Sequence, residues 1–514
     1  MSAGYVSDVA YVRHFIDELA PARLRLAAAT GGVTPPPADD FDYCELGCAH
    51  ADTLSALAAA HPRARFLGID IGREHVASAK KLARDGALDN VGFLEQDFGA
   101  LLEEDVGEFD YIAAYGVLSW ISPDKRAQLR AFAQAKLKPG GLLFVTYNAM
   151  PGWAAVEPLR QLLLSPLGGK ADDPTMERAR RGLEFAREMA NAGAEYFTMN
   201  PAARHMLDTM SKVGLPYVIH EYLHDHWAPM YFARVAWEMS ESDLHFAGVL
   251  PLHLDFRDTA VPESCERAFA ATDRITFESL KDFALNEFFR RDVYVKGRAP
   301  RSPSAFEDLL DATHWGTIVS ALPATREIAL PFRTVKLGAP IFEPLFAALA
   351  EGGATLEHLR TSRPELAGYP PDQLRAALQR LLLAELVVPL SGPTRAPAPD
   401  TEDRFVVPSP YNQMMLRRLT SEQPLVLASE VAGTGFRSSA LEGLALRALT
   451  ETRGPERAGW VSDFVERHEL RLAIDGRLVA ERPEQKQVIA KAIETLCAGR
   501  LAKLVELGIT RPAP

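Results

Sequence analysis

The sequence predicts an α/β protein built on a parallel sheet, followed by a mainly helical domain and a further C-terminal domain. Three observations support this prediction. Residues 41–147 alternate short apolar runs with helical patterns, which is typical of βα units. After Pro151-Gly152-Trp153 the pattern becomes mostly helical. The 514 residues suit about three domains. We therefore expect domains at 1–160, 161–300 and 301–514.

The first domain is expected to contain a Rossmann-like sheet with helices on both faces. Its helices are predicted at residues 22–29, 52–60, 75–84 and 123–137. Its strands are predicted at 43–46, 66–69, 91–94, 109–115 and 142–147, with a turn at the sequence KPGG of 138–141. Ligands of such sheets bind at the carboxyl ends of the strands, so the functional residues are expected there.

The C-terminal domain is expected to contain a winged-helix-like module near residues 340–392. Helical patterns at 341–350, 356–360 and 372–384 precede a short strand at 386–390, and the Pro-rich stretch 392–399 is a predicted linker. A long helix is predicted at 484–507. The module has four arginines, no lysine and six acidic residues. A helix that reads DNA needs a positive surface, so a contact with protein or a packing role is favoured over DNA binding.

Charge and cysteine content exclude several classes of protein. The net charge of −12 argues against a broad nucleic-acid surface. The four cysteines, at 44, 48, 265 and 497, form no CxxC pair, so we expect no metal site and no disulfide framework. Reduced thiols favour a cytoplasmic location. The sequence contains no apolar stretch of about 18 residues, so no membrane insertion is expected.

The turn after the first predicted strand has the residues that a nucleotide-like cofactor requires. It runs Glu45-Leu46-Gly47-Cys48-Ala49-His50-Ala51 and leads into a predicted helix. Small residues at Gly47, Cys48 and Ala49 let the backbone pass close to a ligand, and the helix N-terminus offers free N–H groups. A carboxylate such as that of the methionine part of S-adenosylmethionine (SAM) can accept from these donors. Glu45 would face the amino group.

The next three strands end in residues that suit the rest of SAM. Asp70, followed by Ile71, ends the second strand and can accept two hydrogen bonds from a ribose diol. Asp97 could accept from the adenine amino group, and Phe98 could cover the ring. The fourth strand leads into Tyr115 and Gly116. Each feature alone is weak evidence for a cofactor site, because an Asp at the end of a strand is more often a helix cap. The occurrence of these features in order on successive βα units favours a SAM site.

A nicotinamide-dependent dehydrogenase is the alternative for this domain. It would need the spacing G-x-G-x-x-G, with a third small residue for close helix packing. Here Gly47 is followed by Ala49, and the third position is Asp52. The spacing therefore fits poorly.

Aromatic and polar residues after the fourth and fifth strands are candidates for the pocket of the methyl acceptor. They are Tyr115, Ser119, Trp120, Tyr147, Asn148 and Trp153. An apolar, aromatic pocket disfavours an ammonium and so helps to keep an amine neutral for attack. Ser119, Tyr147 and Asn148 would orient the acceptor. The alternative for each tryptophan is a packing role in the core.

The run His220-Glu221-Tyr222-Leu223-His224-Asp225-His226-Trp227 allows three interpretations. A metal site is disfavoured, because alternate residues of a strand or helix do not converge on one point. A loop beside the active site, with a His or Asp that assists deprotonation, is a second interpretation. A structural polar network is the third and the most common outcome for such a cluster.

These residues resemble the first motif, E/D-x-G-x-G-x-G, of class I SAM-dependent methyltransferases, with Ala49 and Ala51 in place of two glycines. The blocks GVLSWI (116–121), YNAMPGW (147–153), HEYL (220–223) and FRRD (289–292) are similar to bacterial methyltransferases with a methyltransferase regulatory domain. That group includes rickettsial protein-lysine methyltransferases acting on outer-membrane proteins. The resemblance implies SAM as cofactor, S-adenosylhomocysteine as product and lysine methylation as one activity.

Three functions remain open on the sequence. The first is a protein methyltransferase acting on lysine, which the large non-catalytic part of the chain favours. The second is a methyltransferase for a small molecule such as a natural product. The third is a SAM-binding regulator without turnover, which the alanine-substituted turn keeps open. The number of chains in the assembly also stays open, a homodimer included.

Overall fold

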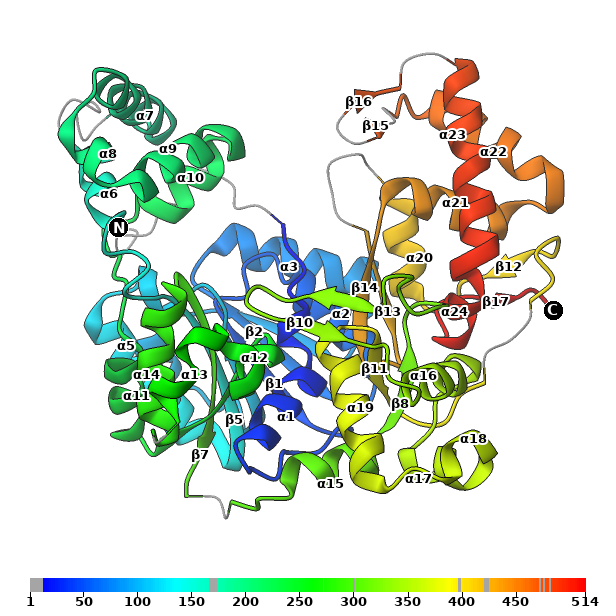
Figure 1. Ribbon diagram of the computed structural model, residues 1–514. Coiled ribbons are helices and arrows are strands. Elements are labelled where there is room, and N and C mark those ends of the chain that lie inside the picture. The colour runs from blue at the N-terminus through cyan, green and yellow to red at the C-terminus, as the bar shows by residue number, and fades with distance from the viewer. Residues whose placement is uncertain are drawn as a thin grey trace.

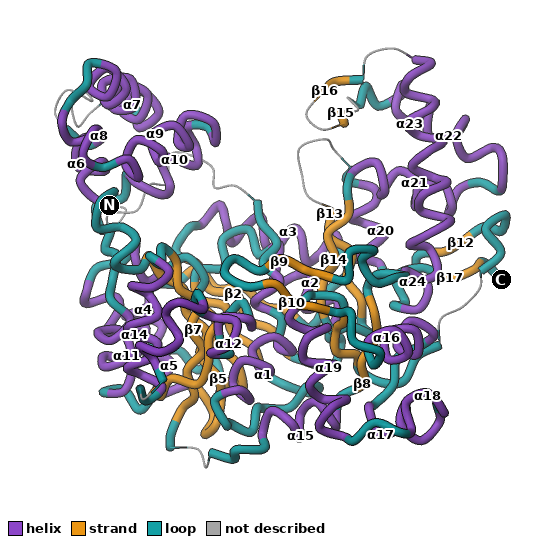
Figure 2. Tube along the Cα trace, in the orientation of Figure 1, coloured by secondary structure: helices purple, strands orange, loops and turns teal. Residues whose placement is uncertain are grey.

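The computed structural model describes residues 13–165, 173–270, 272–298, 301–395, 399–419, 425–470, 473–474, 477–479 and 482–514. The molecule consists of a body with two lobes above it (Figure 1). One lobe contains helices α6–α10 and the other contains the C-terminal helices α20–α24. Figure 2 shows that the strands of the central sheet lie inside the body, between layers of helices. Within the described residues, no helix is both long and apolar enough to cross a membrane.

A seven-stranded sheet forms the centre of the body, in the order β3-β2-β1-β4-β5-β7-β6. Five strands are parallel, and β7 runs antiparallel to both of its neighbours. The strands are β1 (Asp42–Leu46), β2 (Arg65–Asp70), β3 (Val91–Glu95), β4 (Phe109–Ala114), β5 (Leu137–Asn148), β6 (Leu244–Val249) and β7 (Phe289–Lys296). The strand order reverses beside β1, which is where ligands bind in open α/β sheets.

Helices cover both faces of the sheet because its central strands are mostly apolar and almost completely buried. One core includes Leu24 of α1 (Pro21–Thr30), Leu54 of α2 (Asp52–Ala60) and Ala79 of α3 (Arg73–Asp85). The other core includes Phe132 of α5 (Pro123–Lys136) and Val235 of α11 (Phe232–Ser240). Strands with every residue buried, such as β4, are typical of a parallel sheet covered on both sides.

The sheet differs from the sequence-based expectation at its far edge. Strands β6 and β7 lie inside the span 161–300 that we expected to be a mainly helical domain, so a boundary at residue 160 would cut the sheet. Strand β5 begins at Leu137, but its pairing with β4 passes from Leu137 directly to Leu142, and Gly140 has a φ of 78°. Residues 138–141, the expected turn, therefore interrupt the ladder. Strand β5 would be the edge of the parallel sheet, but residues Leu142–Asn148 pair antiparallel with β7, so β5 is an interior strand.

The helical lobe, α6–α10, is an excursion of the chain between β5 and β6. It comprises α6 (Glu157–Leu163), α7 (Thr175–Asn191), α8 (Glu195–Met199), α9 (Pro201–Val213) and α10 (Leu215–Tyr222). The lobe has its own apolar core, to which Trp153 and Leu159 contribute. The chain leaves the sheet at Ala149 and returns beside it at Met230, where the two residues form a parallel bridge. Further helices, among them α12 (Arg257–Ala260), α13 (Glu266–Phe269) and α14 (Arg274–Leu285), then pack against the body.

A buried ionic network joins α14 to strands β5 and β7 of the sheet. The guanidinium of Arg290 on β7 lies 2.8 Å from Glu278, 2.6 Å from Asp282 and 2.8 Å from Asp292. Tyr147 on β5 donates to Asp292 at 2.6 Å. All of these side chains are almost completely buried. Lys281 of α14 also lies 2.7 Å from Glu278, so Arg290 is the cation that joins the carboxylates of α14 to Asp292 on β7.

The expected helices and strand of the C-terminal module are present. They correspond to α16 (Phe342–Glu351), α17 (Leu356–Ser362), α19 (Pro371–Leu383) and β11 (Val387–Leu390). β11 pairs with β8 (His314–Thr317), which follows α15 (Ala305–Ala312), and a hairpin of β9 (Glu327–Ala329) and β10 (Thr334–Lys336) lies between β8 and α16. The short helix α18 (Pro364–Ala367) follows α17. The winged-helix assignment itself stays a prediction. Residues 396–398 of the expected linker lie outside the described residues.

The C-terminal lobe packs around a separate core that includes Leu444, Val461 and Leu504. Its helices are α20 (Pro410–Arg417), α21 (Ala440–Glu451), α22 (Arg457–Arg467), α23 (Arg482–Thr495) and α24 (Leu501–Glu506). The long helix expected at 484–507 is interrupted by a π-turn at Leu496–Arg500. The hairpin of β13 (Leu425–Ser429) and β14 (Thr434–Ser438) connects this lobe to α2 in the body.

Candidate active site

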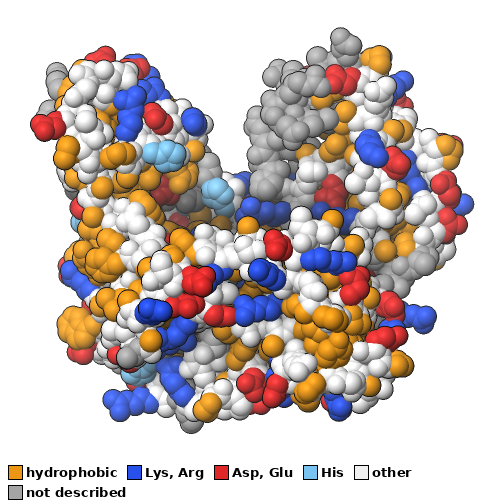
Figure 3. Space-filling model, in the orientation of Figure 1, with side chains coloured by type: hydrophobic (Ala, Val, Ile, Leu, Met, Phe, Trp, Pro, Cys, Tyr) orange, Lys and Arg blue, Asp and Glu red, His pale blue; other side chains and the backbone are white. Residues whose placement is uncertain are grey.

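A cavity of about 860 Å³ opens at the carboxyl ends of β1, β2 and β4. Its walls come from the turn after β1, from the segments after β2 to β5, and from α9 and α10 of the helical lobe. The space-filling view shows the molecule hollowed between its two lobes (Figure 3). The volume is near the upper end of the roughly 300–1,000 Å³ typical of small-molecule sites, so a cofactor and an acceptor side chain can share it.

The turn after β1 is shaped for close approach of a ligand. Gly47 has a φ of 76°, and a Cβ there would lie 2.7 Å from Cγ2 of Val117, so glycine is required. Ala49 and Ala51, with φ of 46° and 56°, also adopt the left-handed conformation, at a cost of roughly 1–2 kcal/mol per residue. Strain of this kind is typical of functional turns. The alanines therefore keep the backbone path that glycines would give.

Glu45 lies buried beneath this turn with an unsatisfied oxygen. Among the described residues, its Oε2 has no hydrogen-bond partner. Burial, with smaller contributions from Asp70 and Asp52, raises the pKa of Glu45 to about 8. A buried carboxyl group without a partner is suited to receive a cation. The ammonium of the cofactor's methionine part is such a cation, so this observation fits SAM.

Binding of SAM should release a proton through Glu45. At pH 7 this carboxyl is mostly protonated, since its pKa is about 8, and a bound ammonium favours the ionised form. Affinity should therefore rise with pH, by up to about tenfold per unit below pH 8. Calorimetry at pH 7 in buffers of different ionisation enthalpy measures the protons released. Glu45→Gln should release none, and an unchanged proton count in that variant would contradict the assignment.

Asp70 closes β2 and lies in the cavity wall beside the turn. Its Oδ2 accepts from the backbone N–H of Ala49 at 2.9 Å, and its Oδ1 accepts from Gly72 N–H at 2.7 Å. His75 Nδ1 lies 3.2 Å from Oδ1. A carboxylate offers about four acceptor directions, so Asp70 fixes the turn and can still accept from a hydroxyl group. Its position fits the expected ribose contact.

Asp97 and Phe98 follow β3 and also line the cavity. Asp97 caps α4 (Phe98–Leu101) by accepting from Gly99 N–H at 2.9 Å, and it pairs with Lys125 of α5. Burial opposes ionisation, but the hydrogen bonds from Lys125 and Gly99 outweigh it and lower the pKa of Asp97. Ile71, 48% exposed, lies in the same wall as a flat apolar surface. Lys125 had no distinguishing signal in the sequence.

The expected acceptor residues divide into two groups. Tyr115, Trp120, Asn148 and Trp153 line the cavity, as does Gly116, which was expected on the cofactor side. Ser119 and Tyr147 are fully buried outside it: Ser119 accepts from Asn148 N–H at 2.8 Å, and Tyr147 belongs to the network of Arg290. Cys48 likewise lies behind the wall, whereas Glu45 lies beneath the turn and is 6% exposed. Ser119, Tyr147 and Cys48 therefore support the residues that form the wall.

The two tryptophans are oriented by hydrogen bonds, whereas the side chain of Asn148 keeps a donor that is unpartnered in the described part of the chain. The buried amide nitrogen of Asn148 has no partner within the described residues. Trp120 Nε1 donates to the backbone oxygen of Glu221 at 3.3 Å, and Trp153 Nε1 donates to that of Phe288 at 2.9 Å. Trp153 also contacts Trp227 edge to face, with ring centroids 5.0 Å apart. The acceptor side of the cavity therefore includes the aromatic side chains of Trp120 and Trp153 together with the amide of Asn148.

The His220–Trp227 run borders the cavity, as one of its three interpretations expected. His220, Glu221, Tyr222, His224 and His226 all line the wall. Part of the run is structural, since Arg160 donates to the backbone oxygen of Tyr222 at 2.9 Å. The part of the chain that the structure describes contains no cluster of three His, Cys, Asp or Glu side chains able to hold a metal ion.

Several lining residues carried no signal in the sequence. His14 and Ile16 come from the N-terminal segment, Met206 and Val213 from α9, and Tyr217 from α10. Phe289 and Arg291 come from β7, within the FRRD block noted above. They lie far from the cofactor turn in sequence, and only the tertiary fold brings them to the cavity.

Family comparisons agree with this geometry. A family model described as "Methyltransferase domain" matches residues 44–143, and one described as "Predicted methyltransferase regulatory domain" matches residues 215–296. An uncharacterized protein of Synechocystis sp. is 29% identical over 511 residues, which cover 99% of each chain. An uncharacterized protein of Rickettsia prowazekii is 25% identical over 272 residues, covering 52% of this chain and 48% of that protein.

A solved structure shares the fold over nearly the whole chain. PKMT2 from Rickettsia typhi, in complex with AdoHcy, superposes with a TM-score of 0.73 at 19% identity, over 97% of this chain and 99% of that one. A second structure of PKMT2 from Rickettsia typhi superposes with a TM-score of 0.71. The two family matches, together with a site that fits SAM, identify the chain as a SAM-dependent methyltransferase that contains a methyltransferase regulatory domain.

Proposed function

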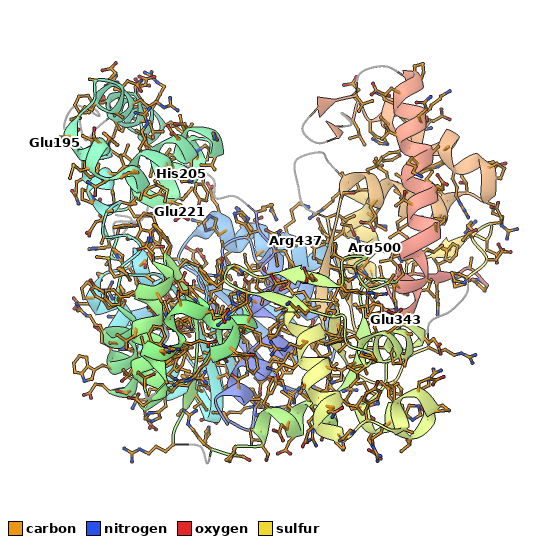
Figure 4. The ribbon with its side chains drawn as sticks, viewed as in Figure 1. Glu195, His205, Glu221, Glu343, Arg437 and Arg500 are labelled. Carbon is orange, nitrogen blue, oxygen red and sulfur yellow. The ribbon has the colours of Figure 1, made fainter. Side chains whose placement is uncertain are left out.

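We propose that this methyltransferase modifies lysine side chains of a protein substrate. The observation that supports the proposal most is the position of Glu221. Its carboxyl group lies in the cavity wall on α10, on the acceptor side, among the aromatic residues Tyr115, Trp120 and Tyr217. Figure 4 places Glu221 at the base of the helical lobe, where the lobe meets the body.

Glu221 differs from the other two carboxylates of the wall. Asp70 is held by two backbone N–H groups, and Asp97 is paired with Lys125. Burial raises the pKa of Glu221 to about 7. A general base works best when its pKa lies near the working pH. Glu221 therefore has the protonation behaviour of a base rather than of a fixed structural anion.

A lysine needs such a base because its ammonium cannot attack. With a free pKa of about 10.4, its deprotonation at pH 7 costs roughly 4–5 kcal/mol. The aromatic wall disfavours the ammonium by desolvation, and the ionised Glu221 can accept the proton that the ammonium loses. Bound SAM supplies a methyl group on a sulfonium, which passes to the amine nitrogen as the sulfur keeps the bonding electrons. Asn148 adds a polar group that can orient the amine.

The size and relatives of the chain support a protein acceptor. The helical lobe contributes Met206, Val213 and Tyr217 to the wall, so the acceptor side extends well beyond the sheet. The sequence resembles rickettsial protein-lysine methyltransferases, and the fold is similar to that of PKMT2 from Rickettsia typhi. A methyltransferase for a small molecule is the alternative, and the experiment below separates the two.

Labelled SAM should transfer its methyl group to protein. The full chain is incubated with labelled SAM and a cell extract, and the products are separated into protein and small-molecule fractions. We expect label in protein, released as methylated lysine on acid hydrolysis. Label only in small molecules, or on a residue other than lysine, would contradict the proposal. Glu195→Gln, a substitution on the exposed surface of the same lobe, is the variant that should behave like the unaltered chain.

A further inference from the structure

The N-terminal strap, residues 13–16, crosses the first turn of α2. Arg13 pairs with Asp52 at 2.6 Å and donates to Ser78 at 2.8 Å. The backbone N–H of Ile16 donates to Thr53 Oγ1 at 2.9 Å. Successive side chains of an extended segment point in opposite directions. Arg13 and Phe15 accordingly contact the protein, whereas His14 and Ile16 line the cavity.

His14 lies at the end of the cavity that fits the methionine part of SAM. Its backbone oxygen accepts from Oγ1 of Thr53, the second residue of α2, at 3.4 Å. The N-terminus of α2 follows the Gly47 turn, and its free N–H groups favour a carboxylate. The imidazole of His14 is exposed to the cavity and can donate one further hydrogen bond to that carboxylate.

The C-terminal lobe holds the strap from the other side. Phe15 is 1% exposed and packs among Leu82 of α3 and Tyr411 and Val426 of the C-terminal lobe. The guanidinium of Arg437 on β14 donates to the backbone oxygen of Phe15. A Cβ at Gly435 would lie 2.9 Å from the Phe15 ring, so β14 approaches the strap as closely as glycine allows. Figure 4 shows Arg437 where the C-terminal lobe meets the body.

We propose that His14 binds the carboxylate of SAM and that the C-terminal lobe, through Arg437 and the β13–β14 hairpin, positions this strap. The cofactor site is then completed by a part of the chain more than 350 residues away from the glycine turn in the sequence. Contacts made only by the C-terminal lobe should control cofactor affinity. This inference concerns the cofactor and does not depend on the identity of the acceptor.

Two ligands of different chemistry test the role of His14. S-Adenosylhomocysteine contains the carboxylate, whereas 5′-methylthioadenosine has the same nucleoside and sulfur but no amino-acid part. His14→Ala in the full chain should lower the affinity for S-adenosylhomocysteine by about tenfold or more. This is the range expected for the loss of a hydrogen bond to a charged group. Affinity for 5′-methylthioadenosine should stay within about twofold. Calorimetry measures both, and His205→Ala, an exposed histidine on α9, is the matched control.

The same pair of ligands tests the C-terminal lobe. Arg437→Met should lower the affinity for S-adenosylhomocysteine several-fold and increase amide hydrogen exchange in the strap. Thermal unfolding of the variant should stay cooperative. Lys491→Met, an exposed position on α23 of the same lobe, should change neither. If His14→Ala lowers the affinity for both ligands equally, or for neither, the proposal that His14 binds the carboxylate is wrong. If folded Arg437→Met binds S-adenosylhomocysteine as the unaltered chain does, the positioning role is wrong.

Discussion

Replacing Arg290 with methionine should lower the free energy of unfolding by about 3–5 kcal/mol, the usual cost of removing one partner from a buried ion pair. The side chain is 2% exposed and contacts Glu278, Asp282 and Asp292. Without it, these carboxylates stay buried with less compensation, and β7 loses its connection to α14. Urea unfolding of the full chain, followed by tryptophan fluorescence, measures the change.

Arg180→Met is the matched control for this experiment. Arg180 pairs with Glu177 and Glu184 on the exposed surface of α7, where ion pairs are screened by water and contribute little. The two substitutions remove the same side chain from opposite environments. Equal unfolding curves for the two variants would show that the Arg290 network does not stabilise the antiparallel part of the sheet.

Replacing Glu221 with glutamine should lower kcat by about 10²–10⁴-fold, the usual contribution of a general base. Affinity for S-adenosylhomocysteine should stay within about threefold, because the cofactor half of the cavity is unaltered. In the unaltered chain at saturating SAM, kcat/KM for the acceptor should fall as the pH drops below about 7, since the Glu221 carboxylate becomes protonated there. That limb of the profile should disappear in Glu221→Gln.

A purely structural role for Glu221 would give a different result. A structural loss would lower the melting temperature and cofactor affinity together and would leave the limb near pH 7 in place. Glu195→Gln on the same lobe controls for the substitution itself. Turnover of Glu221→Gln at the level of the unaltered chain would exclude the carboxylate as the base.

The parallel half of the fold could be predicted because its signals are local. Helix α2 has the predicted bounds, and β1 to β4 lie within one or two residues of theirs. Strands β6 and β7 were missed because their pairing is not local: β7 joins β5 from more than 130 residues further along the chain. The residues between β5 and β7 have a mostly helical pattern, and this pattern dominated the prediction for the whole segment 161–300.

The site shows the same division. Gly47, Asp70 and Asp97 could be predicted because each ends or follows a strand. Tyr147 and Asn148 were both expected in the acceptor pocket, but neighbouring residues of a strand point to opposite faces. Asn148 therefore lines the cavity while Tyr147 points to Asp292. His14 reaches the cavity only through contacts between distant segments, which a sequence pattern does not record. Glu221 belongs to the run that one interpretation placed beside the active site, although that interpretation gave the proton transfer to a His or Asp.

The bridge between Ala149 and Met230 has a consequence for how such proteins diversify. The chain leaves the sheet at Ala149 and returns at Met230, and these two residues are paired with each other. The two ends of the helical excursion are therefore held together by the sheet, independently of the residues between them. Changing its length then alters chain entropy only slowly, by about 0.6 kcal/mol for each doubling. The segment can be replaced or enlarged without shifting the register of β5 and β7. An insertion that keeps α10 with Glu221 can therefore change the acceptor pocket while the cofactor-binding strands stay unchanged.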